Sequence, residues 1–257
     1  MTASMRIALT RAVPQSLERC ELTHLARRPI DVALAVSQHA AYEDALRAAG
    51  CTVVRIPPEP DRPDSVFVED TAVVLDEVAV ITRPGAPSRR GETASTAAAL
   101  GAYRRLVTIE APGTLDGGDV LRIGRRLFAG RSARTNEAGI AQLAAFLAPF
   151  GYRVEGLALT GCLHLKSAVT AIDAETIVLN PAWVDASRLG AQRAIEVDLA
   201  EPLAANILAI GRSVLVNASA PRTAERIRAA GFEVVPVDQS ELAKAESGLT
   251  CCSLILA

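Results

Sequence analysis

The sequence predicts an α/β fold of five repeated units that close into a ring, because short strand pairs recur along the chain at a nearly constant spacing. The first strand of each pair begins 42–49 residues after the previous one. Each of these strands also begins at a polar or titratable side chain, which would cost roughly 2–7 kcal/mol to bury without a partner. These residues are Asp70, Asp119, His164, Asn206 and Cys251. We therefore expect all five to face one polar pocket on a common axis.

The N-terminal part of the chain predicts a strand, a long loop, a helix and a second strand. Arg6–Thr10 is mostly apolar and predicts the first strand. The apolar spacing over Ile30–Ala49 is mainly helical, and Cys51–Ile56 predicts the next strand. A proline-rich connector over residues 57–64 then excludes a helix and places Asp64, its last residue, at the entrance of the following strand pair.

The rest of the chain repeats one order of elements: a strand pair, a turn, a helix and a further strand. The predicted strand pairs are 65–75 with 78–82, 119–123 with 127–129, 164–171 with 176–179, and 206–209 with 213–216. The predicted helices end at Gly101, Phe150 and Ala230. A last strand begins at Cys251 and can be completed only by the first strand of the chain. We therefore expect the N- and C-terminal strands to pair.

The composition predicts one large domain over residues 1–257, with two smaller domains as the alternative, because half of the residues are hydrophobic and can form an ample core. The net charge of −2 and the scattered basic residues disfavour binding to nucleic acid or to an anionic membrane. No apolar run approaches the roughly 20 residues of a membrane span, and residues 1–10 lack the apolar segment of a signal peptide. A cytoplasmic protein is expected.

Cys251 is the candidate nucleophile. The five cysteines of the chain are irregularly spaced and match neither a disulfide framework nor a paired zinc motif. Successive side chains of a strand point to opposite faces, so only one of Cys251 and Cys252 can face a given pocket while the other packs in the core. The alternative is that both are small buried hydrophobic residues, since free cysteine is often fully buried. The polar residues at the other strand starts favour the nucleophile.

His164 is the candidate base, because it alone of the three histidines lies at a predicted strand start. A carboxylate is needed to orient its ring, and the glycine-rich segment that contains Asp116 and Asp119 supplies two. The alternatives are a histidine satisfied within the core and a turn with solvated aspartates.

Asp64, Glu69 and Asp70 form an acidic cluster that suits a metal ion or an organic cation. Two carboxylates match the planar donors of a guanidinium group. If the segment is a strand, alternation places Glu69 and Asp70 on opposite faces unless a bulge intervenes. A zinc site would require Cys251, His164 and Cys162 to converge, and no further paired ligands are present. We therefore expect no metal.

Two arginine-bearing turns follow the first and second strand pairs. They contain Arg89 and Arg134. Each arginine is either an exposed side chain at the start of a helix or one of two residues that together bind a carboxylate group.

Seven motifs that run in order over nearly the whole chain resemble those of the dimethylarginine dimethylaminohydrolases. They are PDSVFVED at 63–70, RPGAPSRRGE at 83–92, TLDGGD at 114–119, SARTN at 132–136, LHLK at 163–166, AAN at 204–206 and LTCCS at 249–253. The resemblance implies the five-bladed, pseudo-symmetric α/β-propeller of guanidino-group-modifying enzymes. Residues 244–248 depart most from the family pattern.

The resemblance also implies residue roles. Cys251 would be the nucleophile, His164 the general acid and base, and Asp116 the orienting acid. The implied substrate contacts are Asp64, Glu69 and Asp70 at the guanidinium, Arg89 and Arg134 at the α-carboxylate, Glu246 at the amine, and Leu17 on a loop that covers the site.

The implied reaction is hydrolysis of Nω-methylated arginine to citrulline and methylamine or dimethylamine through a thiouronium intermediate on cysteine, without a cofactor. The alternatives are arginine deiminase or amidinotransferase activity, which usually belongs to longer chains, and a non-catalytic protein that binds cationic amino acids. The sequence leaves the oligomeric state open, with a homodimer as one option.

Overall fold

The computed structural model describes residues 6–256, and within them the strands form five three-stranded sheets. Residues 1–5, in which the sequence predicts no signal peptide, lie outside the described residues. The sheets, with strands in spatial order, are β15 (Leu254–Leu256), β1 (Arg6–Arg11) and β2 (Cys51–Ile56); β3 (Ala72–Val74), β4 (Val78–Ile81) and β5 (Arg105–Thr108); β6 (Val120–Ile123), β7 (Arg126–Arg131) and β8 (Arg153–Ala158); β9 (Val169–Ala171), β10 (Thr176–Leu179) and β11 (Arg193–Glu196); and β12 (Leu208–Ile210), β13 (Ser213–Asn217) and β14 (Glu233–Val237).

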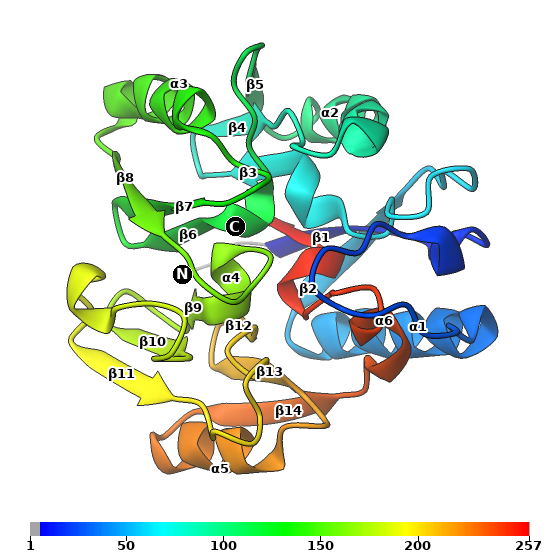
Figure 1. The fold of residues 1–257 in the computed structure, drawn as a ribbon, viewed down its shortest axis with the longest axis vertical. Coiled ribbons are helices and arrows are strands. Elements are labelled where there is room, and N and C mark those ends of the chain that lie inside the picture. The colour runs from blue at the N-terminus through cyan, green and yellow to red at the C-terminus, as the bar shows by residue number, and fades with distance from the viewer. Residues whose placement is uncertain (1–5, 257) are drawn as a thin grey trace.

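All five sheets share one pairing pattern: the middle strand is antiparallel to its first neighbour and parallel to its second. In four sheets the three strands follow one another along the chain. In the fifth, β15 from the C-terminus pairs with β1 from the N-terminus, with Ile7 opposite Leu256. The predicted repeat and the predicted pairing of the two chain ends are therefore confirmed. Figure 1 shows the five sheets arranged like the blades of a propeller around a common centre.

Within residues 6–256, four helices of eight or more residues lie at the rim of this arrangement (Figure 1) and connect the parallel strands of their sheets. They are α1 (Val32–Ala48), α2 (Thr93–Leu100), α3 (Glu137–Leu147) and α5 (Pro221–Ala229). Polar caps explain two of the helix starts, because the side chains of Asp31 and Asn136 accept hydrogen bonds from backbone N–H groups of the first turns of α1 and α3. Two four-residue helices complete the set: α4 (Leu165–Ala168) and α6 (Ser240–Ala243).

The first strands are shorter than predicted, because each is preceded by a helical turn or an irregular segment. Val68–Thr71, Gly117–Asp119 and Thr250–Cys252 form 3-10 turns, and α4 follows His164 directly. The strand starts predicted at 65, 119, 164, 206 and 251 are therefore wrong by one to seven residues. A 3-10 turn repeats every three residues instead of two, so adjacent side chains in these segments do not alternate between faces. This geometry lets several polar side chains reach the centre of the molecule.

The core lies on both sides of the sheets. The middle strands are the most buried elements, and Leu9, Val80, Phe128, Val178 and Leu215 are fully buried. Burial of this kind removes large apolar surfaces from water and fixes the positions of the turns at the centre. Over residues 6–256, the structure contains no helix that is long and apolar enough to cross a membrane.

Candidate active site

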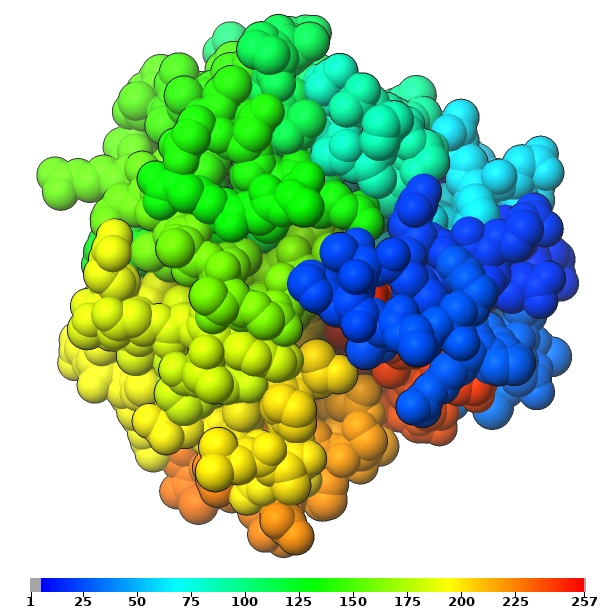
Figure 2. All heavy atoms as spheres, in the orientation of Figure 1, coloured from blue at the N-terminus to red at the C-terminus, as the bar shows by residue number. Residues whose placement is uncertain are grey.

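A small cavity at the centre of the molecule brings together seven of the ten predicted site residues. Its volume is about 20 Å³, which suffices for about one water molecule. Figure 2 shows the N-terminal segment, in blue, lying over this face from its centre to its right side, with only a little of the C-terminal residues, in red, visible beneath it. The predicted residues that line the cavity are Asp64, Asp70, Arg89, Arg134, His164, Glu246 and Cys251.

Cys251 lies on the turn before β15 and presents its thiol to this cavity. The backbone N–H of Gly248 donates a hydrogen bond to Sγ at 3.3 Å. Burial raises the pKa of the Cys251 thiol to about 12, and the negative charges of Glu69 and Asp70 act in the same direction. The thiol is therefore neutral at pH 7 when no ligand is present.

Cys252 faces away from the cavity and is fully buried in the core that also contains Tyr42 and Leu249. The sequence predicts that only one of the two cysteines faces the pocket, and this arrangement is confirmed. The prediction attributed this arrangement to the alternation of side chains along a strand. That reason is wrong, because Cys251 and Cys252 belong to a 3-10 turn and not to a strand.

His164 and Asp116 form a buried pair at the cavity wall. Nε2 of His164 lies 3.0 Å from Oδ2 of Asp116, while Nδ1 lies 3.9 Å from Oδ1 of Asp70. Burial alone would lower the pKa of His164, but the surrounding aspartates, Asp70 foremost, raise it to about 9. The imidazole is therefore protonated at pH 7 and can donate a proton to a bound group.

Asp116 does not line the cavity but lies directly behind His164, fully buried. Its Oδ1 accepts a hydrogen bond at 2.9 Å from the backbone N–H of Gly85. A Cβ at Gly85 would approach the backbone of Arg134 to 2.4 Å, so glycine lets these two turns meet behind the histidine.

Gly118 is the second of the two glycines that follow Asp116, and a side chain at this position would collide with its neighbours. A Cβ at Gly118 would lie 2.8 Å from both Oδ1 of Asp70 and Nδ1 of His164. The missing side chain leaves room for the histidine, and the backbone N–H of Gly118 donates a hydrogen bond to Asp70 at 3.0 Å. Asp119 accepts a hydrogen bond at 3.0 Å from the backbone N–H of Leu165, the residue after His164. Asp119 thus fixes the turn that carries the imidazole without lining the cavity.

Asp70 and Arg89 form a buried ion pair beside His164, with Nη1 of Arg89 donating to Oδ2 of Asp70 at 2.5 Å. Burial would raise the pKa of Asp70, but the charges of His164 and Arg89 outweigh it and lower the pKa to about 2. Asp70 is therefore a permanent negative charge beside the thiol of Cys251.

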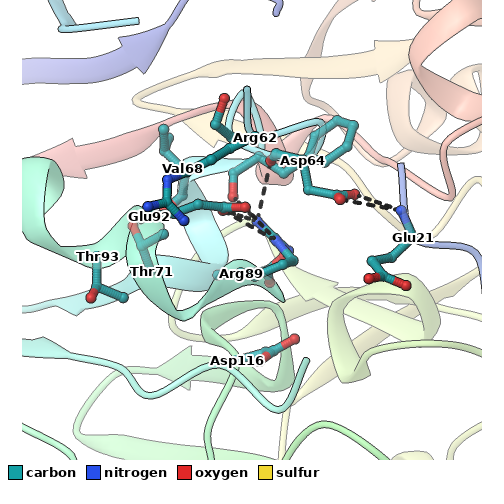
Figure 3. A network of polar contacts seen from close by, with 12 residues as sticks. Glu21, Arg62, Asp64, Val68, Thr71, Arg89, Glu92, Thr93 and Asp116 are labelled. Atoms are coloured by element: carbon teal, nitrogen blue, oxygen red, sulfur yellow. Dashed lines mark hydrogen bonds and ion pairs between the residues drawn. The ribbon is translucent and has the colours of Figure 1, made fainter. Parts of the chain in front are cut away.

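Most of the N–H groups of the Arg89 guanidinium donate hydrogen bonds to other groups of the protein. Figure 3 shows its guanidinium directed at Glu92, which it contacts at 2.9 Å, and at the backbone beside Asp64. Nη1 makes a single hydrogen bond, to Asp70. Because Nη1 carries two hydrogens, one donor remains for a ligand in the cavity.

Arg134 and Asp64 both hold the segment that covers the cavity. Nη2 of Arg134 donates to Oγ1 of Thr23 at 3.3 Å, and the Asp64 carboxylate accepts the backbone N–H of Glu21 at 3.2 Å (Figure 3). Burial raises the pKa of Asp64, with Arg89 opposing it. The arginine at 134 makes fewer internal contacts than Arg89 and is the freer of the two cations.

Glu69 does not line the cavity beside Cys251. Its carboxylate accepts hydrogen bonds from Lys166 at 2.7 Å and from Thr250 at 2.6 Å, and it lines a second cavity of about 230 Å³. Asn206 also lies outside the reaction cavity, where it accepts the backbone N–H of Thr250 at 2.9 Å. Both residues therefore position the turn that carries Cys251. No sequence pattern links Lys166 to Glu69, although Lys166 follows His164 by two residues.

Leu17 does not line the cavity either, since it is fully buried in the core on the turn Leu17–Arg19. The residues that cover the cavity come slightly later in the chain, from Glu21 to Leu25. Glu246 lines the cavity, and its carboxylate accepts backbone N–H groups of this covering segment. About one of its four acceptor positions remains without a hydrogen bond from this segment.

Among the described residues, one group has the composition and spacing to hold a metal ion. It comprises Asp70, Asp116 and His164, whose ligand atoms lie within 4.8 Å of one another. Cys251 and Cys162 do not belong to it, so the convergence that a zinc site would require is not seen in this part of the chain. The three residues instead satisfy one another and neighbouring N–H groups.

Known proteins share this sequence and fold over almost their whole length. A dimethylarginine dimethylaminohydrolase from Streptomyces coelicolor is 43% identical over 251 residues, which cover 97% of this chain and 96% of the relative. This chain is a member of the dimethylarginine dimethylaminohydrolase family. A family member from Pseudomonas aeruginosa is 36% identical over 87% of this chain and 89% of its own. The family model for arginine deiminase also matches residues 31–202.

Solved structures of the dimethylarginine dimethylaminohydrolase family support the same assignment. A cysteine-to-serine mutant of the Pseudomonas aeruginosa protein, complexed with citrulline, superposes with a TM-score of 0.92 at 34% identity and covers 98% of this chain and 100% of its own. The N-terminal domain of ArgZ, a cyanobacterial arginine dihydrolase, superposes with a TM-score of 0.89 at 20% identity, over 99% of this chain and 98% of that domain. The similarity to the ArgZ domain shows only that the two proteins share a fold.

Proposed function

We propose that this protein hydrolyses Nω-methylated arginines, asymmetric dimethylarginine and monomethylarginine, to citrulline and dimethylamine or methylamine. The observation that carries the proposal is the meeting of the Cys251 thiol, the His164–Asp116 pair and the Asp70 carboxylate around one cavity. A thiol nucleophile, a proton donor and a fixed negative charge suit covalent chemistry on a guanidinium. The homologous Pseudomonas aeruginosa protein has been solved with the proposed product, citrulline.

In the proposed mechanism, the Cys251 thiol loses its proton to solvent when the guanidinium binds, and the thiolate then attacks the guanidinium carbon and forms a C–S bond. Protonated His164 gives its proton to the substituted nitrogen, the C–N bond breaks, and the amine leaves a thiouronium intermediate. Neutral His164 then takes a proton from water, and the resulting hydroxide attacks the same carbon. The C–S bond breaks, the proton of the added hydroxyl passes to the sulfur, and citrulline leaves with Cys251 again a neutral thiol and His164 again protonated. Asp116 holds the imidazole through both steps.

Charge complementarity provides the binding side of the proposal. Asp70 and Asp64 lie at the cavity and attract the planar cation, while Glu69 adds negative charge from behind the thiol. Arg134 and the remaining donor of Arg89 bind the α-carboxylate. A bound cation also stabilises the thiolate, so the nucleophile forms only when substrate is present.

We further propose that the five sheets form a closed, pseudo-symmetric, five-bladed propeller and that residues 1–257 act as one cytoplasmic domain, with a homodimer as its proposed assembly. The shared pairing pattern of the sheets and the β1–β15 pairing support the ring.

Citrulline release from three substrates tests the proposed function. We expect asymmetric dimethylarginine and monomethylarginine to give citrulline, and unmethylated arginine to be a poor substrate. The family model for arginine deiminase makes arginine hydrolysis the second candidate, which faster turnover of arginine would favour. A protein that binds methylarginine without forming citrulline would reject both activities.

Replacing Arg134 by alanine should raise KM for dimethylarginine far more than for its decarboxylated analogue. The loss of one hydrogen-bonded charge contact costs on the order of 2–5 kcal/mol, or about 30-fold or more in affinity. Steady-state kinetics on the two substrates measures the difference. Arg131→Ala is the matched control, because Arg131 ends β7 three residues before Arg134, is exposed and pairs with Glu137. Equal losses on both substrates would contradict the carboxylate contact.

The free thiol should react slowly with a neutral electrophile at pH 7. Because burial raises the pKa of Cys251 to about 12, the thiolate fraction grows about tenfold for each pH unit up to that value. We therefore expect alkylation by iodoacetamide to accelerate steadily from pH 6 to pH 9. A cationic haloacetamidine should react well at pH 7, since its charge replaces that of the substrate.

Ultraviolet titration of the thiolate gives an independent measurement of the same group. A thiolate already formed at pH 6 without ligand would reveal a preformed ion pair between Cys251 and His164. The proposal that substrate creates the nucleophile would then be wrong.

A further inference from the structure

The carboxylate of Glu246 holds the segment that covers the cavity. Its two oxygens accept three consecutive backbone N–H groups, from Thr23 at 2.9 Å and from His24 and Leu25 at 2.5 Å each. Consecutive N–H groups that converge on one point form a binding site for an anion, and hydrogen bonds to a charged acceptor are the stronger kind. The negative charge of Glu246 therefore occupies a ready-made site on a segment more than 220 residues away in sequence.

The position of Glu246 links this contact to the nucleophile. Glu246 adopts a left-handed backbone with φ of 58°, which is uncommon for a residue with a side chain. It precedes Ser247 and Gly248, and the N–H of Gly248 donates to Sγ of Cys251. The contact thus joins the covering segment to the turn that supports the thiol.

The covering segment, Glu21–Leu25, also has contacts that do not involve Glu246. Its five residues are exposed or half-buried, and no helix or strand includes them. The side chain of Glu21 accepts a hydrogen bond from Ser88 at 2.7 Å, and Leu22 packs against the core. The hydrogen bonds of the segment to other residues that line the cavity go to Asp64 and Arg134. Both of those groups have a proposed role with substrate, so a ligand would compete with the segment for them. Glu246 accepts three hydrogen bonds from this segment, more than any other single residue.

The volume of the cavity requires this segment to move. Ligand sites usually enclose about 300–1,000 Å³, whereas the cavity here measures about 20 Å³. A neighbouring pocket of about 320 Å³ shares Leu163, Glu246 and Ser247 with it, and is also lined by His24 and Leu25. If the three hydrogen bonds break, the covering segment can move away from the two cavities and open a path to Cys251.

We propose that Glu246 is the latch of the covering segment, and that breaking its hydrogen bonds to Thr23, His24 and Leu25 admits substrate and releases product. Glu246 is a positioning residue in this proposal, because it acts on the segment and not on the reacting atoms. The proposal rests on the proposed function only for the identity of the ligand that enters. The latch itself is a property of the free protein.

Hydrogen exchange of the free protein tests the latch directly. We expect Glu246→Gln, and more strongly Glu246→Ala, to speed exchange of the amides of residues 23–25 at least tenfold, while the central strands exchange as before. Glu241→Gln is the matched control, since Glu241 also accepts a backbone N–H, from Asp31, but does not contact the covering segment. Glu246→Asp keeps the charge and should restore part of the protection.

Two results of the exchange experiment would overturn the latch. One is unchanged exchange at residues 23–25 in Glu246→Ala. The other is faster exchange throughout the chain, which would give Glu246 a general role in stability.

Binding kinetics tests whether the latch controls access. In a Cys251→Ser background, Glu246→Ala should raise both the association and the dissociation rate of dimethylarginine at least tenfold. Faster exchange with unchanged rates would overturn the control of access. If the Cys251→Ser protein does not bind dimethylarginine at all, the proposed function is wrong. The latch would then be tested by the hydrogen-exchange experiment alone.

Discussion

Cys251→Ser should reduce citrulline formation by at least about 10⁴-fold and leave substrate binding nearly intact. Serine has nearly the same shape, but its hydroxyl ionises far less readily than a thiol, so the nucleophile is lost while the cavity is kept. Steady-state turnover measures the first effect, and calorimetric binding of dimethylarginine measures the second.

Cys252→Ser is the matched control for this substitution. Cys252 is fully buried in the core and does not line the cavity, so its replacement should lower stability modestly and leave the reaction in place. Comparable loss of turnover in both variants would contradict the assignment of Cys251. Retained turnover in Cys251→Ser would contradict covalent catalysis altogether.

His164→Asn should reduce turnover of dimethylarginine by about 10²–10⁴-fold, the usual contribution of a general acid and base. The loss should depend on the leaving group. Dimethylamine needs a proton to leave, and that proton comes from His164, whose pKa is raised to about 9. S-methylthiocitrulline releases a thiolate that leaves without protonation, so its first step should be impaired much less and the intermediate should accumulate.

His24→Gln is the control for the histidine substitution, because its side chain is exposed and only its backbone N–H is used, by Glu246. Equal losses on both substrates in His164→Asn would contradict proton donation to the amine. The histidine would then serve only to position other groups.

The repeated fold could be predicted because its signals are local. The spacing of the strand pairs is visible in the chain, and the pairing of β1 with β15 followed from the absence of any other partner for the last strand. The short turns before the first strands could not be predicted, because their hydrogen bonds involve residues distant in sequence. Asp119, for example, accepts the N–H of Leu165, 46 residues away.

The cavity-lining residues were largely found from the sequence, since titratable side chains at strand starts are hard to explain as core. The neighbours of these residues were not found. Glu69 lies behind the thiol because Lys166 and Thr250 bind its carboxylate, and nothing local to Glu69 indicates this. Leu17 was expected to cover the site, yet its apolar side chain is more stable in the core. The Glu246 contact joins two segments that no sequence pattern connects.

The most direct test of the covalent mechanism is mass spectrometry of protein quenched with acid during turnover of dimethylarginine. We expect an adduct on the peptide that contains Cys251. The same adduct mass should arise from asymmetric dimethylarginine with ordinary or deuterated methyl groups, because dimethylamine leaves before the thiouronium intermediate accumulates. An adduct that retains the deuterium label, or citrulline formation with the adduct on another cysteine, would contradict the proposed mechanism.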